Sequence, residues 1–244
     1  MAMKICAAQI RPTKGDIEQN IAQHKALIAL AMNYGAEFIF FPELSLTGYE
    51  PELAQALATH PNDSRLDDFQ IISDKHQLTI GAGMPLRNES GITISMILFQ
   101  PNQPRQVYSK KYLHADEQPF FVSGESTAEL IGPQNEVALA ICYELSVPEH
   151  AAKAHRNGAK VYVASVAKSA AGVEKAAETL SQIAEKYTMT VVMANAVGFC
   201  DNFESAGKSG VWNSQGELLA ELNNVQEGIL IFDTETQTTV IKGM

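Results

Sequence analysis

The sequence predicts an α/β fold in which two packed sheets carry helices on their outer faces. Strands and helices alternate in the first third of the chain, strands dominate the middle, and a strand–helix–strand pattern returns after residue 136. Roughly ten strands are expected, and because that number strains a single open sheet, two sheets are favoured. The 244 residues contain no low-complexity linker and no short-period repeat, which predicts one domain over residues 1–244.

The element boundaries follow from apolar periodicity and from turn residues. In the first helix Ile17, Ile21 and Ile28 recur at helical spacing. Asp16 precedes this helix as its N-cap, and Gly35 ends it. Helices are expected at residues 17–32, 66–76, 147–157 and 173–187. Strands are expected at residues 4–10, 36–41, 78–84, 91–99, 105–110, 137–141, 160–166 and 190–197, with shorter ones at 210–212, 218–219 and 229–231.

Composition and charge narrow the classes of partner. The sequence is 45% hydrophobic and 19% charged, which is typical of a soluble globular protein. Its net charge of −10 argues against nucleic acid or an anionic membrane as partner. No stretch has the length of a membrane span and no signal peptide is visible, so a cytoplasmic location is expected. The three cysteines form neither a disulfide framework nor a CxxC metal pattern, and no metal or cofactor is expected.

The stretch from Glu136 to Glu144 is the one around which the chain is organised. Five consecutive apolar residues, 137–141, indicate a strand buried on both faces, and Cys142 stands where that strand ends. Ends of parallel strands are where α/β sheets place their chemistry. An isolated buried cysteine more often packs as a small hydrophobic residue than acts as a nucleophile. Cys142 on its own therefore does not indicate a catalytic site.

Two further reactive side chains follow predicted strands, Glu43 after residues 36–41 and Lys110 at the end of residues 105–110. Together with Cys142 they form a coherent catalytic device. A nearby ammonium lowers the pKa of a thiol, and the thiolate is the nucleophile. A partly desolvated carboxylate can take the thiol proton and return it to a leaving nitrogen. The lysine then stabilises an oxyanion, with the backbone N–H of Tyr143 as a second donor.

Three blocks of sequence carry a resemblance to a known family. They are FPELSLTGY at residues 41–49, YSKKYL at 108–113 and ICYELSVPE at 141–149. In this order they resemble the signature blocks of the nitrilase superfamily, the carbon–nitrogen hydrolases, and the likeness is to its amidase-like branch. The resemblance implies a four-layer α-β-β-α sandwich, a Glu-Lys-Cys triad, and homodimers or larger homo-oligomers.

Carried over residue by residue, the resemblance makes Glu43 the general base and acid, Lys110 the oxyanion-stabilising cation and Cys142 the nucleophile. Lys110 is preferred to its neighbour because the family's lysine lies three residues before a leucine, here Leu113. The family's second glutamate corresponds to Glu117, which orients or tunes Lys110. The reaction implied is hydrolysis, by water, of a small amide or N-carbamoyl compound through a cysteine thioester.

Residues around the triad give weaker expectations. Tyr49 and Tyr143 are expected as walls of the substrate pocket, and Lys168 can reach the pocket mouth, where it can bind a substrate carboxylate or simply be solvated. The arginine common in the family four residues after the cysteine is Ser146 here. This departure leaves the triad alone but weakens any transfer of substrate type.

Alternative readings are open as well. His114 and His150 suggest a Cys-His hydrolase, but Cys142 lacks the flanking glycines of a nucleophile elbow, so both histidines are expected as surface or hydrogen-bonded polar residues. Cys6 is expected in the core, and Cys200 in a loop as an exposed or half-buried thiol. A catalytically silent binding or assembly module of the same fold, or a nitrile hydrolase, is the alternative function.

Overall fold

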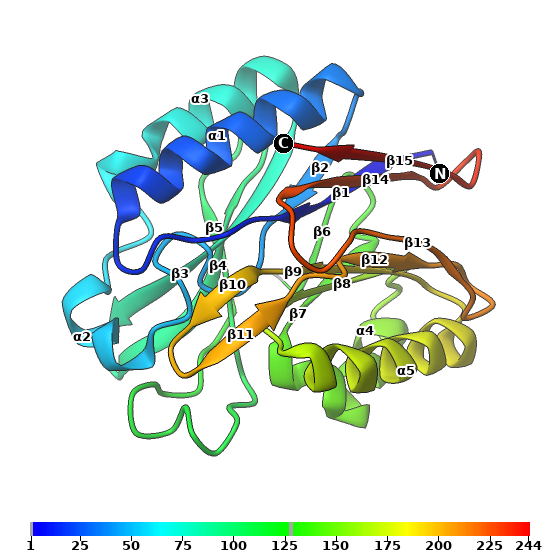
Figure 1. The fold of residues 1–244 in the computed structure, drawn as a ribbon. Coiled ribbons are helices and arrows are strands. Elements are labelled where there is room, and N and C mark those ends of the chain that lie inside the picture. Colours follow the sequence, from blue (N-terminus) through cyan, green and yellow to red (C-terminus); the bar gives the residue numbers. More distant parts are fainter. Residues whose placement is uncertain (1, 127–128) are drawn as a thin grey trace.

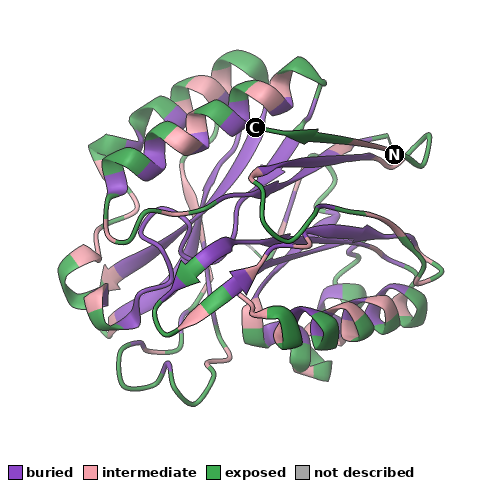
Figure 2. Ribbon diagram, viewed as in Figure 1, coloured by how far each residue is buried: buried purple, intermediate pink, exposed green. Residues whose placement is uncertain are grey.

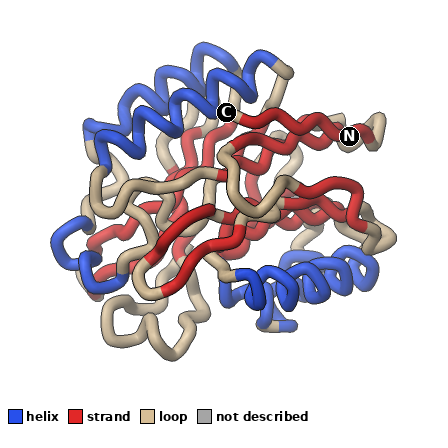
Figure 3. Tube along the Cα trace, viewed as in Figure 1, coloured by secondary structure: helices blue, strands red, loops and turns tan. Residues whose placement is uncertain are grey.

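The computed structural model describes residues 2–126 and 129–244 and arranges them in four layers. Two sheets stack face to face, and helices cover the outer face of each (Figure 1). Figure 3 shows the strands between the two layers of helices. The α-β-β-α sandwich expected from the sequence is confirmed.

The first sheet has seven strands in the order β15-β14-β1-β2-β3-β4-β5. Its centre, β1-β2-β3, is parallel, and its remaining pairs are antiparallel. The strands are β1 (Lys4–Gln9), β2 (Phe38–Phe40), β3 (Thr79–Asn88), β4 (Gly91–Phe99), β5 (Gln106–Ser109), β14 (Gly228–Asp233) and β15 (Thr238–Gly243).

The second sheet has six strands in the order β13-β12-β9-β8-β7-β6, with β7, β8 and β9 parallel. A separate two-stranded hairpin follows β9. The strands of the sheet are β6 (Leu130–Ile131), β7 (Val137–Ile141), β8 (Val161–Val166), β9 (Thr190–Asn195), β12 (Gly210–Trp212) and β13 (Leu218–Glu221), and those of the hairpin are β10 (Val197–Cys200) and β11 (Phe203–Ala206).

Helices α1 (Ile17–Asn33) and α3 (Asp67–His76) cover the first sheet, and α4 (Pro148–Arg156) and α5 (Ala170–Tyr187) cover the second (Figure 1). Shorter helical segments are α2 (Ala54–Leu57), η1 (Pro51–Leu53), η2 (Ser64–Leu66) and η3 (Cys142–Ser146). In the described part of the chain, no helix combines the length and the apolar character that crossing a membrane requires.

The core consists of three apolar layers, and strand alternation creates them. In β1, Ile5 and Ala7 point into the cluster between the two sheets, whereas Cys6 and Ala8 point toward α1 and α3. A third cluster packs the second sheet against α4 and α5. Figure 2 shows this burial in the sheets, with exposed residues on the outer sides of the helices. Central strands are apolar on both faces because both faces are covered.

Most predicted elements form with small shifts at their ends. Residues 91–99 and 137–141 match β4 and β7, and Asp16 caps α1 by accepting a hydrogen bond from the backbone N–H of Gln19 at 3.0 Å. The strand expected at 190–197 instead ends at Asn195, and β10 begins at Val197. The prediction of Cys200 in a loop is wrong, because this residue lies in β10 and is 2% exposed.

Candidate active site

Glu43, Lys110 and Cys142 follow strands β2, β5 and β7 respectively, so the site forms where the two sheets meet. The turn that carries Glu43 packs tightly on β3. A Cβ atom at Gly83 would lie 2.4 Å from the backbone nitrogen of Leu44, so this position requires glycine. Across the sheets, the Ser165 hydroxyl donates to the Phe41 carbonyl at 2.6 Å. These contacts fix the conformation of the turn that carries the Glu43 carboxylate.

Lys110 is fully buried, and its ammonium group lies between two carboxylates. Its Nζ donates to Glu43 Oε1 at 2.8 Å and to Glu117 Oε1 at 2.5 Å. Burial lowers the pKa of Lys110. The negative charges of Glu43, Cys142 and Glu117 together raise this pKa by more, so the net pKa lies well above its usual value. The lysine is therefore a permanent cation, and its third N–H is left for another acceptor.

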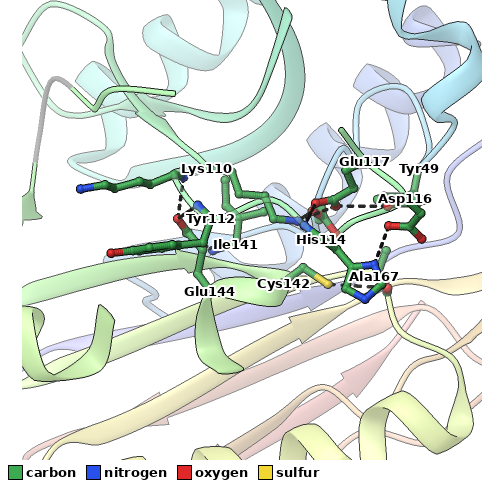
Figure 4. Close-up of polar contacts among 12 residues, drawn as sticks. Tyr49, Lys110, Tyr112, His114, Asp116, Glu117, Ile141, Cys142, Glu144 and Ala167 are labelled. Atoms are coloured by element: carbon green, nitrogen blue, oxygen red, sulfur yellow. Dashed lines mark hydrogen bonds and ion pairs between the residues drawn. The ribbon is translucent and has the colours of Figure 1, made fainter. Parts of the chain in front are cut away.

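Glu117 is fixed by further hydrogen bonds. Its Oε1 also accepts from the Tyr49 hydroxyl at 3.1 Å, and its Oε2 accepts from the His114 backbone N–H at 2.7 Å. Both carboxylate oxygens are thus satisfied, and the residue is 2% exposed. A carboxylate held in this way can orient Lys110 while staying out of proton transfer. Figure 4 shows these contacts around Lys110 and Glu117.

Glu43 is the carboxylate that remains available. Its Oε2 is buried and has no hydrogen-bond partner among the described residues. Burial raises the pKa of Glu43 to about 7, Lys110 opposes the rise, and Glu117 adds to it. A carboxyl group with this pKa is poised to accept and return a proton near neutral pH.

Cys142 begins η3 directly after β7, with a positive φ of 45°. A left-handed conformation at a non-glycine residue is strained and is typical of functional positions. The thiol is only partly exposed, and it faces the Ala167 carbonyl with an Sγ–O separation of 4.0 Å.

The ammonium of Lys110 lowers the pKa of this thiol, as expected from the sequence, but burial and other groups raise the pKa by more. Burial and the charge of Glu43 raise the pKa of Cys142 to about 11, although Lys168 and Lys110 lower it. Desolvation disfavours the thiolate more than the two cations favour it. The resting thiol is therefore protonated, and attack requires a base.

Glu144 connects the turn at Cys142 to the loop that follows Lys110. No role for this residue was predicted from the sequence. Its Oε2 accepts from the Ile141 backbone N–H at 2.9 Å and from the Tyr108 hydroxyl at 2.7 Å. Its Oε1 accepts from the Lys111 backbone N–H at 2.7 Å. Because Ile141 and Lys111 adjoin Cys142 and Lys110, this buried carboxylate sets the distance between the two loops. Figure 4 shows Glu144 beside Ile141 and Tyr112. The signal in the sequence was an acidic residue three positions after the end of an apolar strand.

A cavity of about 590 Å³ opens at Cys142. Tyr49 and Tyr143 both line it, as do Lys168 and Phe203, while Tyr143 remains 38% exposed. The backbone N–H of Tyr143 lies in the first turn of η3, where N–H groups lack intrahelical acceptors. The roles of both tyrosines as substrate walls stay predictions.

The two histidines differ in their surroundings. His114 pairs with Asp116 at 2.6 Å at the cavity, and both side chains are largely exposed. His150 lies on α4 outside this cavity, where its ring bonds the hydroxyls of Tyr108 at 2.7 Å and Tyr162 at 2.8 Å. Neither histidine has a hydrogen bond to a cysteine in the described part of the chain. No cluster of three or more metal-ligating side chains occurs among residues 2–126 and 129–244.

Comparison with known proteins identifies relatives over most of the chain. The carbon–nitrogen hydrolase family model matches residues 4–240. A protein described as the hydrolase in the agr operon of Staphylococcus aureus is 28% identical over 229 residues, which cover 91% of this chain and 87% of the relative. A glutamine-dependent NAD+ synthetase from Thermotoga maritima is 25% identical over 243 residues, which cover 96% of this chain but only 42% of the synthetase.

Two solved structures of an amidase from Nesterenkonia sp. AN1 share the fold. A cysteine-to-alanine mutant in complex with butyramide has a TM-score of 0.85, is 21% identical, and covers 96% of this chain and 92% of the amidase. A glutamate-to-leucine mutant shows covalent addition of the acetamide moiety of fluoroacetamide at the active site cysteine; its TM-score is 0.85, its identity 22%, and its coverage 95% and 90%. Because the family model spans almost the entire sequence, this chain belongs to the carbon–nitrogen hydrolases of the nitrilase superfamily.

Proposed function

We propose that this protein is an amidase-type hydrolase in which Cys142 is the nucleophile, Glu43 the general base and acid, and Lys110 the cation that stabilises the oxyanion. One observation carries the proposal: a fully buried lysine is held between Glu43 and Glu117 beside a cavity that ends at a cysteine. Burying three charges is costly, and such arrangements are typical of functional sites. The solved amidase with an acetamide group on its active site cysteine supports the same role for Cys142.

The first step is proton transfer with attack. Glu43 Oε2 takes the proton of the Cys142 thiol, and Sγ forms a bond to the carbonyl carbon of the amide. The C=O bond becomes a C–O⁻ single bond, and its negative charge is stabilised by the third N–H of Lys110 and by the backbone N–H of Tyr143. The raised pKa values support this order of events, because a protonated thiol and an ionised Glu43 coexist above pH about 7.

The second half of the cycle returns the proton. When the C–N bond breaks, protonated Glu43 donates to the leaving nitrogen, so ammonia or an amine departs and a thioester remains on Cys142. Glu43 then takes a proton from water, whose oxygen attacks the thioester carbonyl. Release of the carboxylic acid regenerates the thiol, and the proton on Glu43 goes to the sulfur.

Glu117 and Tyr49 have supporting roles in this proposal. Glu117 holds Lys110 in place through the 2.5 Å contact, and Tyr49 positions Glu117 from the cavity side. Tyr143 adds a wall of the substrate site as well as its backbone donor. Small amides and N-carbamoyl compounds come ahead of nitriles, because the amidase of the same fold binds butyramide and the cavity of about 590 Å³ suits small molecules.

Release of ammonia from a panel of small amides, ureido acids and nitriles tests the proposal. Turnover of one class is expected, with complete loss in Cys142→Ala. Cys200→Ser is the matched control, since Cys200 is also a lone thiol but lies buried in β10. Turnover that survives in Cys142→Ala would refute the nucleophile. Absence of turnover across the panel in the wild-type protein would favour the silent binding module instead.

A further inference from the structure

We propose that Lys168 binds a carboxylate on the substrate, so that the preferred substrates are short amides carrying one carboxylate near the scissile bond. This inference rests on the proposed amide hydrolysis and names its substrate class. The observations that carry it are the position of Lys168, the absence of a partner for its charge, and the charges of the other residues at the cavity.

The backbone of Lys168 is held firmly at the cavity. This residue follows β8, and its N–H donates to Asn195 Oδ1 at 2.9 Å, while Asn195 Nδ2 donates back to the Lys168 carbonyl at 3.2 Å. The same carbonyl accepts from the Ala206 N–H at 2.9 Å. Asn195 is itself fully buried and also bonds the Gly207 carbonyl at 2.7 Å. These hydrogen bonds fix the backbone from which the Lys168 side chain extends.

The ammonium group of Lys168 lacks a partner among the residues that the structure describes. In the described residues it forms no ion pair and no side-chain hydrogen bond, although Lys168 is partly buried. It is also the single lysine or arginine among the described residues that line the cavity. A partly buried cation without a counter-charge binds a ligand anion favourably, because a charge-assisted hydrogen bond replaces water at that site.

The remaining charged lining is acidic, which limits where an anion can bind. Glu52, Asp116 and Asp201 are exposed residues of the lining, and Glu117 is already paired with Lys110. When the amide carbonyl occupies the donor site of Lys110, Lys168 is the cation lining the described cavity that can offset the repulsion between these acidic groups and a substrate carboxylate. The cavity therefore selects one carboxylate at one position, and a second negative charge on the substrate is disfavoured.

Lys168 is also near enough to the reacting sulfur to set the length of the substrate. The carbonyl of Ala167, the residue before Lys168, lies 4.0 Å from Sγ of Cys142, and all three residues line the same cavity. An amide carbonyl at Cys142 and a carboxylate at Lys168 must therefore be joined by a short chain. The ω-amides of small dicarboxylic acids have this form.

The experiment compares succinamate with butyramide, a neutral amide of the same chain length, in the wild-type protein and in Lys168→Gln. The expected result is a loss of roughly 10- to 100-fold in the ratio of kcat/KM for succinamate to that for butyramide, the worth of one charged hydrogen bond. The ratio removes the general effect of Lys168 on the thiol, which both substrates share. Lys168→Arg should retain part of the preference. Lys175→Gln removes an exposed lysine of α5 as the matched control and should leave the ratio unchanged.

The outcomes separate the two proposals. A wild-type protein that hydrolyses butyramide, with a ratio unchanged to within about twofold in Lys168→Gln, overturns the role of Lys168 and leaves amide hydrolysis standing. If the wild-type protein hydrolyses neither compound, binding of succinamate to Cys142→Ala by calorimetry decides the role of Lys168. Binding that is weakened by Lys168→Gln supports it, and binding that is absent or unaffected overturns it.

Discussion

Replacing Glu43 by glutamine removes the proposed base while keeping the shape of the side chain. The glutamine can still accept from Lys110, so the buried cluster loses one charge rather than a contact. The magnitude of the effect follows from the thiol. With a pKa of about 11, Cys142 is ionised at pH 7 in only about one molecule in 10⁴. Without the base, turnover depends on the thiolate fraction, for which the wild-type pKa gives a lower limit, and kcat/KM is expected to fall by roughly 10²- to 10⁴-fold.

The same substitution should make the thiol easier to alkylate. The charge of Glu43 raises the pKa of Cys142, so its removal lowers that pKa. The thiolate fraction at pH 8 rises about tenfold for each pH unit by which the pKa falls. Turnover and the rate of iodoacetamide alkylation are therefore expected to change in opposite directions, which a general loss of folding cannot produce.

The wild-type pH profile gives a third measure of the same base. Since the pKa of Glu43 is about 7 and its ionised form is the active one, kcat/KM should rise with pH through this value. At pH 6 it should be roughly one tenth of its plateau. Glu136→Gln is the matched control, because Glu136 is also buried with an unpartnered oxygen but lies outside the cavity. Turnover of Glu43→Gln within tenfold of wild type, or a flat profile from pH 5 to 9, would refute the reasoning.

Three other substitutions test the buried charged residues Lys110, Glu117 and Glu144. Lys110→Met leaves the carboxylates of Glu43 and Glu117 buried without a counter-charge, so the free energy of unfolding in urea should fall by about 3–5 kcal/mol. Glu117→Gln removes a charge that raises the pKa of Glu43, so the acid limb of the pH profile should move to lower pH. Glu144→Gln keeps the shape but directs an amide N–H at one of its backbone donors; a loss of about 1–3 kcal/mol in unfolding free energy is expected, with slower turnover as the turn at Cys142 loosens.

Neighbouring residues supply the controls for these three. Lys111→Met removes an exposed lysine, and Glu149→Gln an exposed carboxylate of α4. Equal destabilisation by Lys110→Met and Lys111→Met would contradict the buried ion cluster. An acid limb that moves to higher pH in Glu117→Gln would contradict the assigned interaction with Glu43. For Glu144, unchanged stability and unchanged turnover would show that the carboxylate does not support the loop.

The sequence predicted the layers of the fold because the central strands are apolar on both faces. Residues 137–141 are all buried and form β7 with the predicted bounds. The edge strand β15 (Thr238–Gly243) was missed because its residues are exposed or only partly buried, so no apolar run indicates it. The hairpin β10–β11 was missed for a related reason, since Phe199 in it is 80% exposed. Edge strands are specified by hydrogen bonds to neighbours, which leave a weak pattern in sequence.

The candidate site was predictable as a set of residues but not as an electrostatic environment. Glu43, Lys110 and Cys142 are far apart in sequence, and their placement after strand ends indicated that they lie close together. The partners that fix them are specified by tertiary contacts. Glu144 and Asn195 each bond the backbone of a different loop, and a sequence read in order gives no sign of such contacts. The pKa of Cys142 likewise depends on burial, which raises it by more than the charges of Lys168 and Lys110 lower it.

Because the resting thiol is protonated, the species that the charge of Lys110 stabilises is the substrate oxyanion and not a resting thiolate. Moving the proton from Cys142, with a pKa of about 11, to Glu43, with a pKa of about 7, costs on the order of 5 kcal/mol in the free protein. The negative charge does not stay on sulfur, because attack transfers it to the substrate oxygen beside Lys110. A cation that stabilises this oxyanion more than the thiolate lowers the barrier without stabilising the thiolate beforehand. The buried lysine then serves the substrate oxygen, and the free thiol stays neutral and resistant to oxidation until an amide is bound.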